Sequence, residues 1–203
     1  RGLGKYKRIG TTIDDSLGEA FDKTAKMLGF GFPGGPEIEK YSKKGNPDKF
    51  DLPKPIINKG GCNFSFAGLK TAVLRYKNFI KTKKDKYDLA ASFQATVLKI
   101  IYKKTKVAIS EFKKVSKGRS LIVAGGVAAN KQIRNIIKKV CYEENFKIYF
   151  PKNELCTDNA AMIAIAGLKK FKQKKFNNLN FSVKPRWPLD NKAKFLKGSG
   201  VKL

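Results

Sequence analysis

The segment SLIVAGGVAANKQIRNIIKKVCYEENFKIYF, residues 120–150, decides the fold class of this chain. It begins with the short apolar run 120–124, which is typical of a buried strand. The glycine pair 125–126 then opens a turn, residues 128–143 are predicted to form a helix, and residues 147–150 a second strand. Strand, helix and strand in this order favour parallel pairing, so the sequence predicts an α/β fold.

The flanking segments add helices to this unit. A helix is predicted over residues 12–29, capped by Asp14 or Asp15, and a short helix after the turn FPGGP. Residues 47–66, which end in the alternating run NFSF, predict an extended segment or a hairpin. Further helices are expected over residues 68–80 and 87–115, and a last one is expected to start at Thr157-Asp158-Asn159. We expect residues 1–176 to form one domain and residues 177–203 a basic tail.

Composition excludes several classes of protein. The chain has no histidine, which excludes a Ser-His-Asp triad and any imidazole metal ligand. Its three cysteines form no CxxC pair, which argues against a disulfide framework or a structural zinc site. No apolar run reaches the ~18–20 residues of a membrane span, and no signal peptide is visible, so a cytoplasmic location is expected. The first residue is Arg1, not Met, which suggests a further segment upstream.

The charge of the chain is strongly unbalanced. Among its 203 residues, 44 Lys and Arg oppose 16 Asp and Glu, which gives a net charge of +28. Such an excess attracts polyanions, and nucleic acid is the natural candidate. Only six of the basic residues are Arg, however, and a Lys-rich genome would give the same excess. The charge is therefore consistent with nucleic-acid binding and with a Lys-rich genome alike. The Lys-rich residues 81–86 and 169–175 are candidate RNA contacts.

Two motifs follow the predicted strands. In VAGGVAAN, residues 123–130, paired glycines before a helix allow close backbone approach to a nucleotide or phosphate, and Asn130 in the first turns of that helix could bind a base or ribose. A tight turn without a ligand explains the same glycines. In CTDNAAM, residues 156–162, Asp158 is a candidate metal ligand, although Thr157 or Asp158 could equally cap the last helix.

Three motifs lie in the first third of the chain. GEAFDK, residues 18–23, places two carboxylates on one helix face, where they could bind ribose hydroxyls or pair with lysines. FPGGP, residues 32–36, allows a backbone path that only glycine takes easily. In FSFAGLKT, residues 64–71, Ser65 and Lys70 could form a nucleophile pair, but no residue is placed to orient them.

Taken together and in this order, the blocks IDDSLGEAFDKTAKMLG, PGGP, FSFAGLKT, VAGGVAANKQIR and ELCTDNAAMIA resemble the TsaD family, also called Gcp or YgjD. The resemblance covers roughly residues 9–190 and includes FSVKPRWPL near the C-terminus. It implies an actin-like/Hsp70-like ATPase fold of the ribonuclease H-like type, with this chain as the C-terminal part of a two-lobed protein. It also implies transfer of a threonylcarbamoyl group from threonylcarbamoyl-AMP to N6 of the adenosine 3′ of the anticodon in tRNAs that read codons beginning with A.

The resemblance also assigns residues. Asp22, Gly35 and Asn130 would bind the nucleotide part of the substrate, with Glu39 as a further contact, and Asp158 would bind a divalent metal, iron(II) first and zinc as the alternative. TsaB and TsaE are the implied protein partners. The family's N-terminal HxxxH metal ligands and SGGHT-type loop are not in this chain, so the chain alone is expected to be inactive.

Three other functions are consistent with parts of the sequence. The first is another enzyme of the superfamily, a sugar kinase or O-carbamoyltransferase, against which GEAFDK and FSFAGLKT argue. The second is a truncated, non-catalytic paralogue that acts as a scaffold or RNA-binding partner. The third is a general basic RNA-binding module, for which binding would fall steeply with salt and show no preference among tRNAs.

Overall fold

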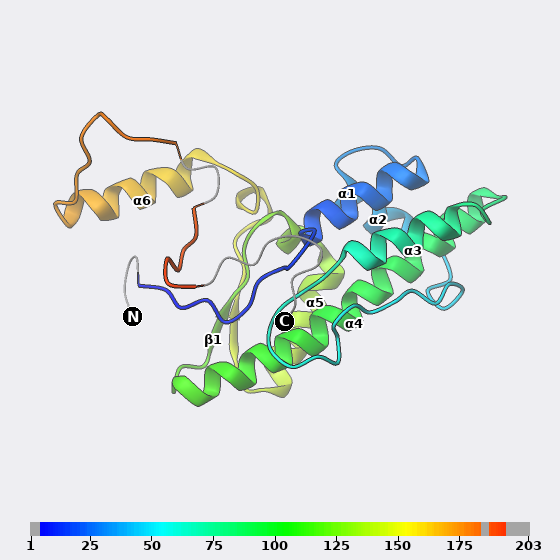
Figure 1. The fold of residues 1–203 in the computed structure, drawn as a ribbon, viewed down its shortest axis with the longest axis horizontal. Coiled ribbons are helices and arrows are strands. Elements are labelled where there is room, and N and C mark those ends of the chain that lie inside the picture. Colours follow the sequence, from blue (N-terminus) through cyan, green and yellow to red (C-terminus); the bar gives the residue numbers. More distant parts are fainter. Residues whose placement is uncertain (1–4, 184–186, 194–203) are drawn as a thin grey trace.

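The computed structural model describes residues 5–183 and 187–193 and is dominated by helices around a small parallel sheet (Figure 1). The helices are α1 (Leu17–Leu28), α2 (Gly34–Ser42), α3 (Ala67–Lys77), α4 (Lys83–Val115), α5 (Lys131–Glu143) and α6 (Ala160–Lys172). The strands are β1 (Ser120–Ile122) and β2 (Lys147–Tyr149), and two 3₁₀ turns are η1 (Gly126–Ala129) and η2 (Asn153–Leu155). The predicted α/β class with parallel pairing is confirmed.

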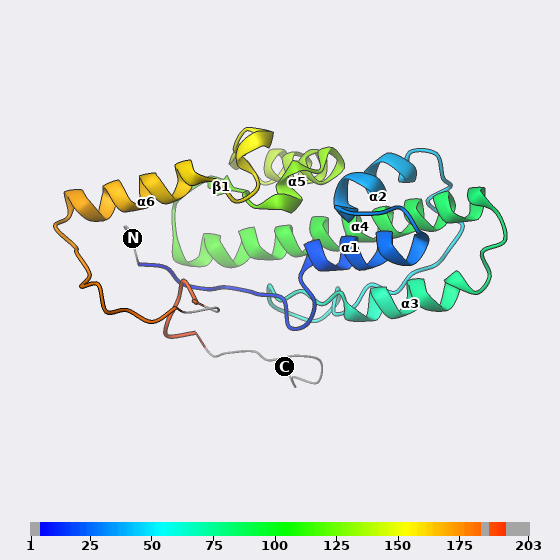
Figure 2. The same ribbon diagram turned by 90° about the horizontal axis from the view of Figure 1, so that it is seen from above.

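Helix α4 is the element against which four other helices pack. Its 33 residues span about 50 Å, and α1, α2, α3 and α5 pack along it (Figures 1 and 2). Apolar residues recur along it at helical spacing and face the core, where Leu89, Phe93, Val97 and Ile100 are fully buried. The helix starts at Lys83, four residues before the predicted Tyr87, because Thr82 and Asp85 form a reciprocal capping box.

The sheet consists of β1 and β2, paired in parallel with Leu121 opposite Ile148. These two side chains are partly buried against the core, whereas the alternate positions Ile122 and Tyr149 are exposed. Both strands are shorter than the predicted segments 120–124 and 147–150. The turn after β1 continues as η1, so α5 begins at Lys131 and not at the predicted Ala128.

The start of α1 differs from the prediction. Ser16 caps the helix and forms a capping box with Glu19, so α1 begins at Leu17 and neither Asp14 nor Asp15 is its cap. The Asp14 carboxylate instead accepts hydrogen bonds from the backbone N–H groups of Phe66 (2.8 Å) and Ala67 (3.3 Å) and from the Ser65 hydroxyl. Asp14 therefore caps α3, which has no cap from its own N-cap residue.

Residues 47–66 do not form the hairpin that was one of the two predicted forms. Their last part runs beside the N-terminal segment through one parallel bridge between Thr12 and Phe64. Two backbone hydrogen bonds hold it, from Ile13 N–H to Phe64 O (2.9 Å) and from Phe64 N–H to Thr11 O (2.8 Å). This pairing brings Asp14 to the start of α3.

Helix α6 projects away from the other helices (Figures 1 and 2). Asn159 caps it by accepting from Met162 N–H at 3.0 Å, so the predicted caps Thr157 and Asp158 are wrong. All thirteen of its residues are exposed, although much of the helix is apolar. The exposed apolar side chains of α6 include Ile163, Ile165, Leu168 and Phe171.

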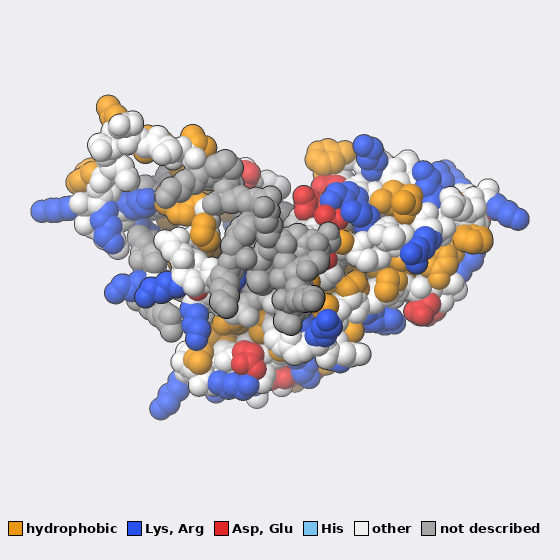
Figure 3. All heavy atoms as spheres, in the orientation of Figure 1, with side chains coloured by type: hydrophobic (Ala, Val, Ile, Leu, Met, Phe, Trp, Pro, Cys, Tyr) orange, Lys and Arg blue, Asp and Glu red, His pale blue; other side chains and the backbone are white. Residues whose placement is uncertain are grey.

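Basic side chains are dispersed over the surface. Figure 3 shows Lys and Arg spread from end to end of the viewed face, without one continuous patch. The two Lys-rich stretches lie at opposite ends of the molecule, residues 81–86 at the start of α4 and residues 169–175 at the end of α6 (Figure 1). Within the described residues, no helix combines the length and apolarity of a membrane span. The predicted tail 177–203 falls partly on residues outside the described ranges.

Candidate functional site

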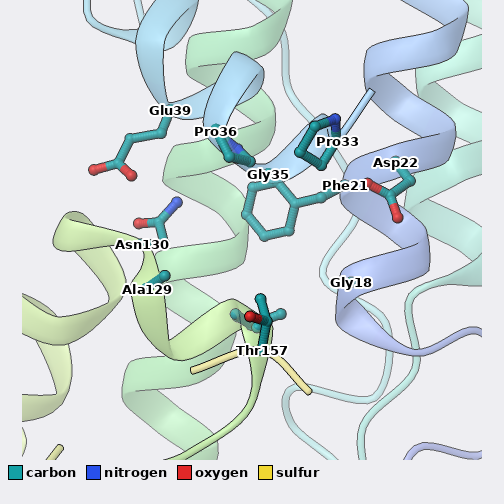
Figure 4. Close-up of a pocket in the computed structure, with 12 residues that line it drawn as sticks. Gly18, Phe21, Asp22, Pro33, Gly35, Pro36, Glu39, Ala129, Asn130 and Thr157 are labelled. Carbon is teal, nitrogen blue, oxygen red and sulfur yellow. The ribbon is translucent and has the colours of Figure 1, made fainter. Parts of the chain in front are cut away.

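A cavity of about 480 Å³ lies where α1, the start of α2 and the turn before α5 meet (Figure 4). Its volume is in the range of small-molecule and cofactor sites, roughly 300–1,000 Å³. The three predicted substrate-binding residues, Asp22, Gly35 and Asn130, all line it. Glu39 and Thr157 line it as well. Four segments that are distant in the sequence thus meet at one cavity.

Asp22 has one carboxylate oxygen committed to the fold. Its Oδ1 accepts a hydrogen bond from Gly34 N–H at 2.7 Å. The N-cap of α2 is Pro33, which makes no side-chain cap, so a carboxylate from α1 takes that place. The second oxygen, Oδ2, accepts no hydrogen bond from the described residues, and Asp22 is only partly buried. It can therefore accept hydroxyl hydrogens from a ligand in the cavity.

We expect Asp22→Ala to lower the unfolding midpoint by roughly 3–8 °C, because the buried Gly34 N–H loses its acceptor, a cost of about 1–3 kcal/mol. Asp22→Asn keeps an acceptor oxygen and should shift the midpoint by less than half as much. Thermal unfolding followed by circular dichroism measures both. Glu19→Gln, which removes a carboxylate charge elsewhere on α1, is the control. Equal losses in the alanine and asparagine variants would contradict this assignment of Oδ1.

The adjacent glycines of the PGGP turn have different roles. A Cβ at Gly34 would lie 2.5 Å from the Asp22 Cα and 2.7 Å from the Phe21 carbonyl oxygen, so this glycine allows α2 to touch the α1 backbone. A Cβ at Gly35 would have no atom within 4 Å. Gly35 instead keeps the cavity wall free of a side chain, and its N–H belongs to the first helical turn, which has no intrahelical acceptor.

Asn130 and Glu39 occupy the N-terminus of α5. Asn130 is its N-cap, where its Oδ1 accepts from Ile133 N–H at 3.0 Å, and not a residue of the helix's first turns as predicted. Glu39 Oε1 accepts from Lys131 N–H at 3.0 Å. Two N–H groups at this helix N-terminus, where a phosphate could otherwise bind, are therefore already bonded to side chains of the chain. The Asn130 amide nitrogen donates one hydrogen to Gln94 Oε1 at 3.3 Å, which leaves its second hydrogen without an acceptor among the described residues.

The floor of the cavity contains residues that sequence reasoning did not assign to the site. Phe21 lines the cavity, and Figure 4 shows its ring between Asp22 and Asn130. Phe93 of α4 packs edge-on against it, with ring centroids 5.3 Å apart at 82°. The next residue, Gln94, contacts Asn130. In the sequence neither Phe93 nor Gln94 belongs to a motif that indicates a site.

The other acidic residues near the start of α1 are engaged in ion pairs or caps. Asp15 binds Lys23 (2.7 Å) and Lys70 (3.1 Å). The hydrogen bond from Lys23 holds the pKa of Asp15 below its ordinary value, against the opposing effect of burial, and Lys70 acts in the same direction. Because Ser65 donates to Asp14 and Lys70 pairs with Asp15, neither side chain activates the other as a nucleophile.

Asp158, the predicted metal ligand, lies directly after the cavity residue Thr157 and has an exposed carboxylate. In the described part of the chain, no three His, Cys, Asp or Glu residues come close enough to hold a metal ion. One carboxylate is too few ligands for a divalent cation site. The described residues alone therefore do not fit a complete metal centre.

The chain is similar in sequence to a known protein family and to individual curated proteins. Residues 1–165 match the model of the TsaD family, described as tRNA N6-adenosine threonylcarbamoyltransferase. A protein of that name from Pelagibacter ubique (strain HTCC1062) is 62% identical over 205 residues and covers 100% of the chain. A second, from Rickettsia rickettsii (strain Sheila Smith), is 50% identical and covers 94%. A third, from Rickettsia bellii (strain OSU 85-389), is 48% identical and covers 93%. The chain spans 57% of the length of each of these relatives.

Proposed function

The chain belongs to the TsaD family, which implies an actin-like ATPase fold, and from that premise we propose that its cavity holds the nucleotide part of threonylcarbamoyl-AMP. The proposed reaction transfers the threonylcarbamoyl group to N6 of the adenosine 3′ of the anticodon, in tRNAs that read codons beginning with A. The proposal rests on one observation: Asp22, Gly35 and Asn130 line the same cavity of about 480 Å³.

Each wall of the cavity suits a part of an adenylate. The free Oδ2 of Asp22 can accept hydrogen bonds from ribose hydroxyls. The N–H of Gly35, in the first turn of α2, can donate to a phosphate oxygen that lies close to the backbone. The apolar ring of Phe21 offers a surface for a base, and the Asn130 amide nitrogen a donor for it. Glu39, beside Asn130, is a further contact on the same wall.

The chemistry proposed at this site is an acyl transfer. The N6 amine of the tRNA adenosine attacks the carbamoyl carbonyl carbon of threonylcarbamoyl-AMP, and a C–N bond forms. The bond from that carbon to the phosphate oxygen breaks, AMP leaves with the electron pair, and the amine loses a proton to solvent. The contribution of this chain is to hold the AMP portion so that its leaving oxygen is fixed in position. No residue of the chain is assigned as acid or base.

The proposal includes a two-lobed protein in which this chain forms the C-terminal part. The exposed apolar side chains of α6 support it, because soluble proteins normally cover such surfaces. The length of the relatives supports it too, since they are longer than the chain. Residues 1–176 would belong to the actin-like domain and 177–203 to a basic tail. A cytoplasmic location, tRNA as substrate, and TsaB- and TsaE-type partners are further parts of the proposal.

A divalent metal, iron(II) with zinc as the alternative, is the cofactor that the family implies. Asp158 is the residue of this chain that we propose as a ligand, because its carboxylate is exposed next to the cavity wall at Thr157. The remaining ligands would come from outside the chain. Among the described residues, no group of three His, Cys, Asp or Glu side chains is placed to complete such a site.

Transfer of labelled threonine to tRNA tests the proposed function. The mixture contains threonine, bicarbonate, ATP and TsaB, TsaC and TsaE proteins, and the chain is tested alone and with the N-terminal part of a TsaD protein added. Label is expected only with the addition. Asp158→Ala should lower it by roughly 100-fold or more if the carboxylate is a metal ligand. Glu154→Ala, which removes an exposed carboxylate from the same loop, is the matched control and should retain transfer.

Three results would each count against the proposal or a part of it. Label with the chain alone would show that the chain needs no N-terminal part. No label in either mixture, with partners that are active on an intact TsaD protein, would favour a non-catalytic scaffold or RNA-binding partner. Equal loss in Asp158→Ala and Glu154→Ala would remove the metal role of Asp158 and leave the transfer function standing.

A further inference from the structure

A buried pair of amide side chains lies behind the cavity, one from α4 and one from the N-terminus of α5. Asn130, which lines the cavity, is 7% exposed, and Gln94, which does not line it, is 1% exposed. The Asn130 Nδ2 donates a hydrogen bond to Gln94 Oε1 at 3.3 Å. Gln94 follows Phe93, which packs against the cavity residue Phe21. Consecutive residues of α4 thus support two side chains of the cavity.

The orientation of the Asn130 amide is fixed by its surroundings. Its Oδ1 must accept the Ile133 N–H at the start of α5, because an amide NH₂ group has no acceptor there. The Nδ2 therefore faces Gln94. That nitrogen carries two hydrogens, and Gln94 Oε1 takes one of them. The second hydrogen is left for a group in the cavity.

Gln94 is oriented at a cost to the folded state. Its Nε2 is buried and has no hydrogen-bond partner among the described residues. Rotating the amide by 180° would move Nε2 toward Asn130, but two NH₂ groups would then face each other and the Asn130 hydrogen bond would be lost. The arrangement that satisfies Asn130 is therefore the one that leaves a Gln94 donor unpaired. A residue selected for packing alone would be apolar at this position, as its neighbours Phe93 and Val97 are.

We propose that Gln94 is a positioning residue, which holds the Asn130 amide so that its second N–H donates to a ring nitrogen acceptor of a purine bound in the cavity. The inference rests on the proposed function, since it takes an adenine nucleotide as the ligand. Gln94 itself touches no ligand. Its contribution is to prevent the amide from turning its donor away from the base, so that recognition of the base depends on a residue of α4.

Binding of two probes to the chain separates this role from a structural one. AMP carries the base, whereas ribose 5-phosphate has the same sugar phosphate without it. Gln94→Met has a similar volume but removes the acceptor for Asn130. We expect it to raise the AMP dissociation constant about five- to tenfold, as for one lost hydrogen bond, and to change that of ribose 5-phosphate by less than about twofold. Isothermal titration calorimetry, or ligand-observed NMR for weak binding, gives both constants.

Conservative and control variants test the orientation. Gln94→Glu keeps an acceptor oxygen toward Asn130 and is expected to keep AMP binding within about threefold of the unmodified chain. Thr24→Val removes another fully buried, unpartnered polar group, in α1 and outside the cavity lining, and should leave both constants unchanged. The thermal midpoint of every variant is recorded, so that a loss of folded protein is seen directly.

A double-mutant cycle keeps the test informative if Gln94→Met is unstable. Asn130→Asp retains the oxygen that caps α5 and removes the donor, so it should raise the AMP dissociation constant by a similar factor. In that background, Gln94→Leu should bind AMP as tightly as the chain with Gln94 unchanged, because no Asn130 donor is left to position. A further loss in Gln94→Leu beyond Asn130→Asp would overturn the proposal.

The remaining outcomes are distinguishable. The unmodified, folded chain could bind ribose 5-phosphate and AMP equally, or bind neither. In either case, both the proposal that the cavity binds a nucleotide and the proposed role of Gln94 would be wrong. If the unmodified chain prefers AMP and Gln94→Met has the same preference, the role of Gln94 is wrong and the proposed function is unaffected. A parallel weakening of both probes in Gln94→Met would show a general structural role and would also overturn the inference.

Discussion

Gly34→Ala is expected to lower the unfolding midpoint by roughly 6–12 °C, whereas Gly35→Ala, one residue further on, is expected to leave it unchanged or raise it slightly. A Cβ at Gly34 would lie 2.5 Å from the Asp22 Cα and 2.9 Å from the Ala25 Cβ, so the α1 and α2 backbones would have to separate. Overpacking against backbone costs about 3 kcal/mol, at the upper end of the usual range. At Gly35 a methyl group meets no atom within 4 Å, and alanine favours helix.

Substitutions of these two glycines should affect stability and ligand binding separately. Gly35→Val places a branched side chain at the cavity wall, so we expect AMP affinity to fall at least tenfold while the unfolding midpoint stays within about 3 °C. Thermal unfolding and calorimetric titration of the three variants measure both effects. Equal destabilisation by Gly34→Ala and Gly35→Ala would mean that the contact between α1 and α2 is not the one described. Unchanged AMP binding in Gly35→Val would remove Gly35 from the site.

Three cavity residues share one arrangement, in which one polar atom of each side chain makes a hydrogen bond within the fold. Asp22 uses Oδ1 to cap α2, Asn130 uses Oδ1 to cap α5, and Glu39 uses Oε1 to bind Lys131 N–H. Each side chain is therefore fixed before a ligand arrives, which lowers the entropy lost on binding. Substitution by alanine at these positions removes the hydrogen bond within the fold as well as any atom available to a ligand, so it changes stability and binding together. Asp22→Asn and Asn130→Asp are more informative, because each keeps the oxygen that holds the fold.

The family resemblance, which short glycine and polar motifs carry, assigns three residues to the site from the sequence alone. PGGP and GGVAAN, with GEAFDK, supplied Gly35, Asn130 and Asp22, and all three line the same cavity. The α/β class followed from strands at 120–124 and 147–150 around a helix. The proposed ligand roles were implied by the family resemblance and await the binding experiments.

What the sequence could not predict depends on contacts between distant residues. Asp14, Asp15 and Ser16 are all favoured caps, and their order does not tell which one caps α1. The pattern Ser16-x-x-Glu19 is a capping-box signature and could have settled that point. That Asp14 caps α3 depends on the pairing of Thr12 with Phe64, which no local pattern indicates. Gln94 likewise has no local signal, because its role comes from contact with Asn130, 36 residues away.

Asp14→Ala is expected to destabilise the chain strongly, by about 3–4 kcal/mol or roughly 8–15 °C in the unfolding midpoint. Asp14 is the acceptor for three groups: the N–H groups of Phe66 and Ala67 and the hydroxyl of Ser65. Ser65 and Phe66 are buried, so their donors would lose their acceptor without full access to water. The loss also uncouples the N-terminal segment from α3, because Asp14 joins parts of the chain that are 51 to 53 residues apart.

Matched variants assign this cost to the hydrogen bonds. Asp14→Asn keeps one acceptor oxygen for the two backbone N–H groups, while the Ser65 hydroxyl can turn to accept from the new NH₂ group, so we expect less than half of the alanine loss. Asp51→Ala removes a carboxylate that is almost fully exposed and paired with Lys54 at 3.6 Å, and should cost under about 0.5 kcal/mol. Chemical unfolding of the four proteins decides the point. If Asp14→Ala were no worse than Asp51→Ala, α3 would not depend on Asp14 for its start, and the join between the N-terminal segment and α3 would have to rest on the Thr12–Phe64 backbone pairing alone.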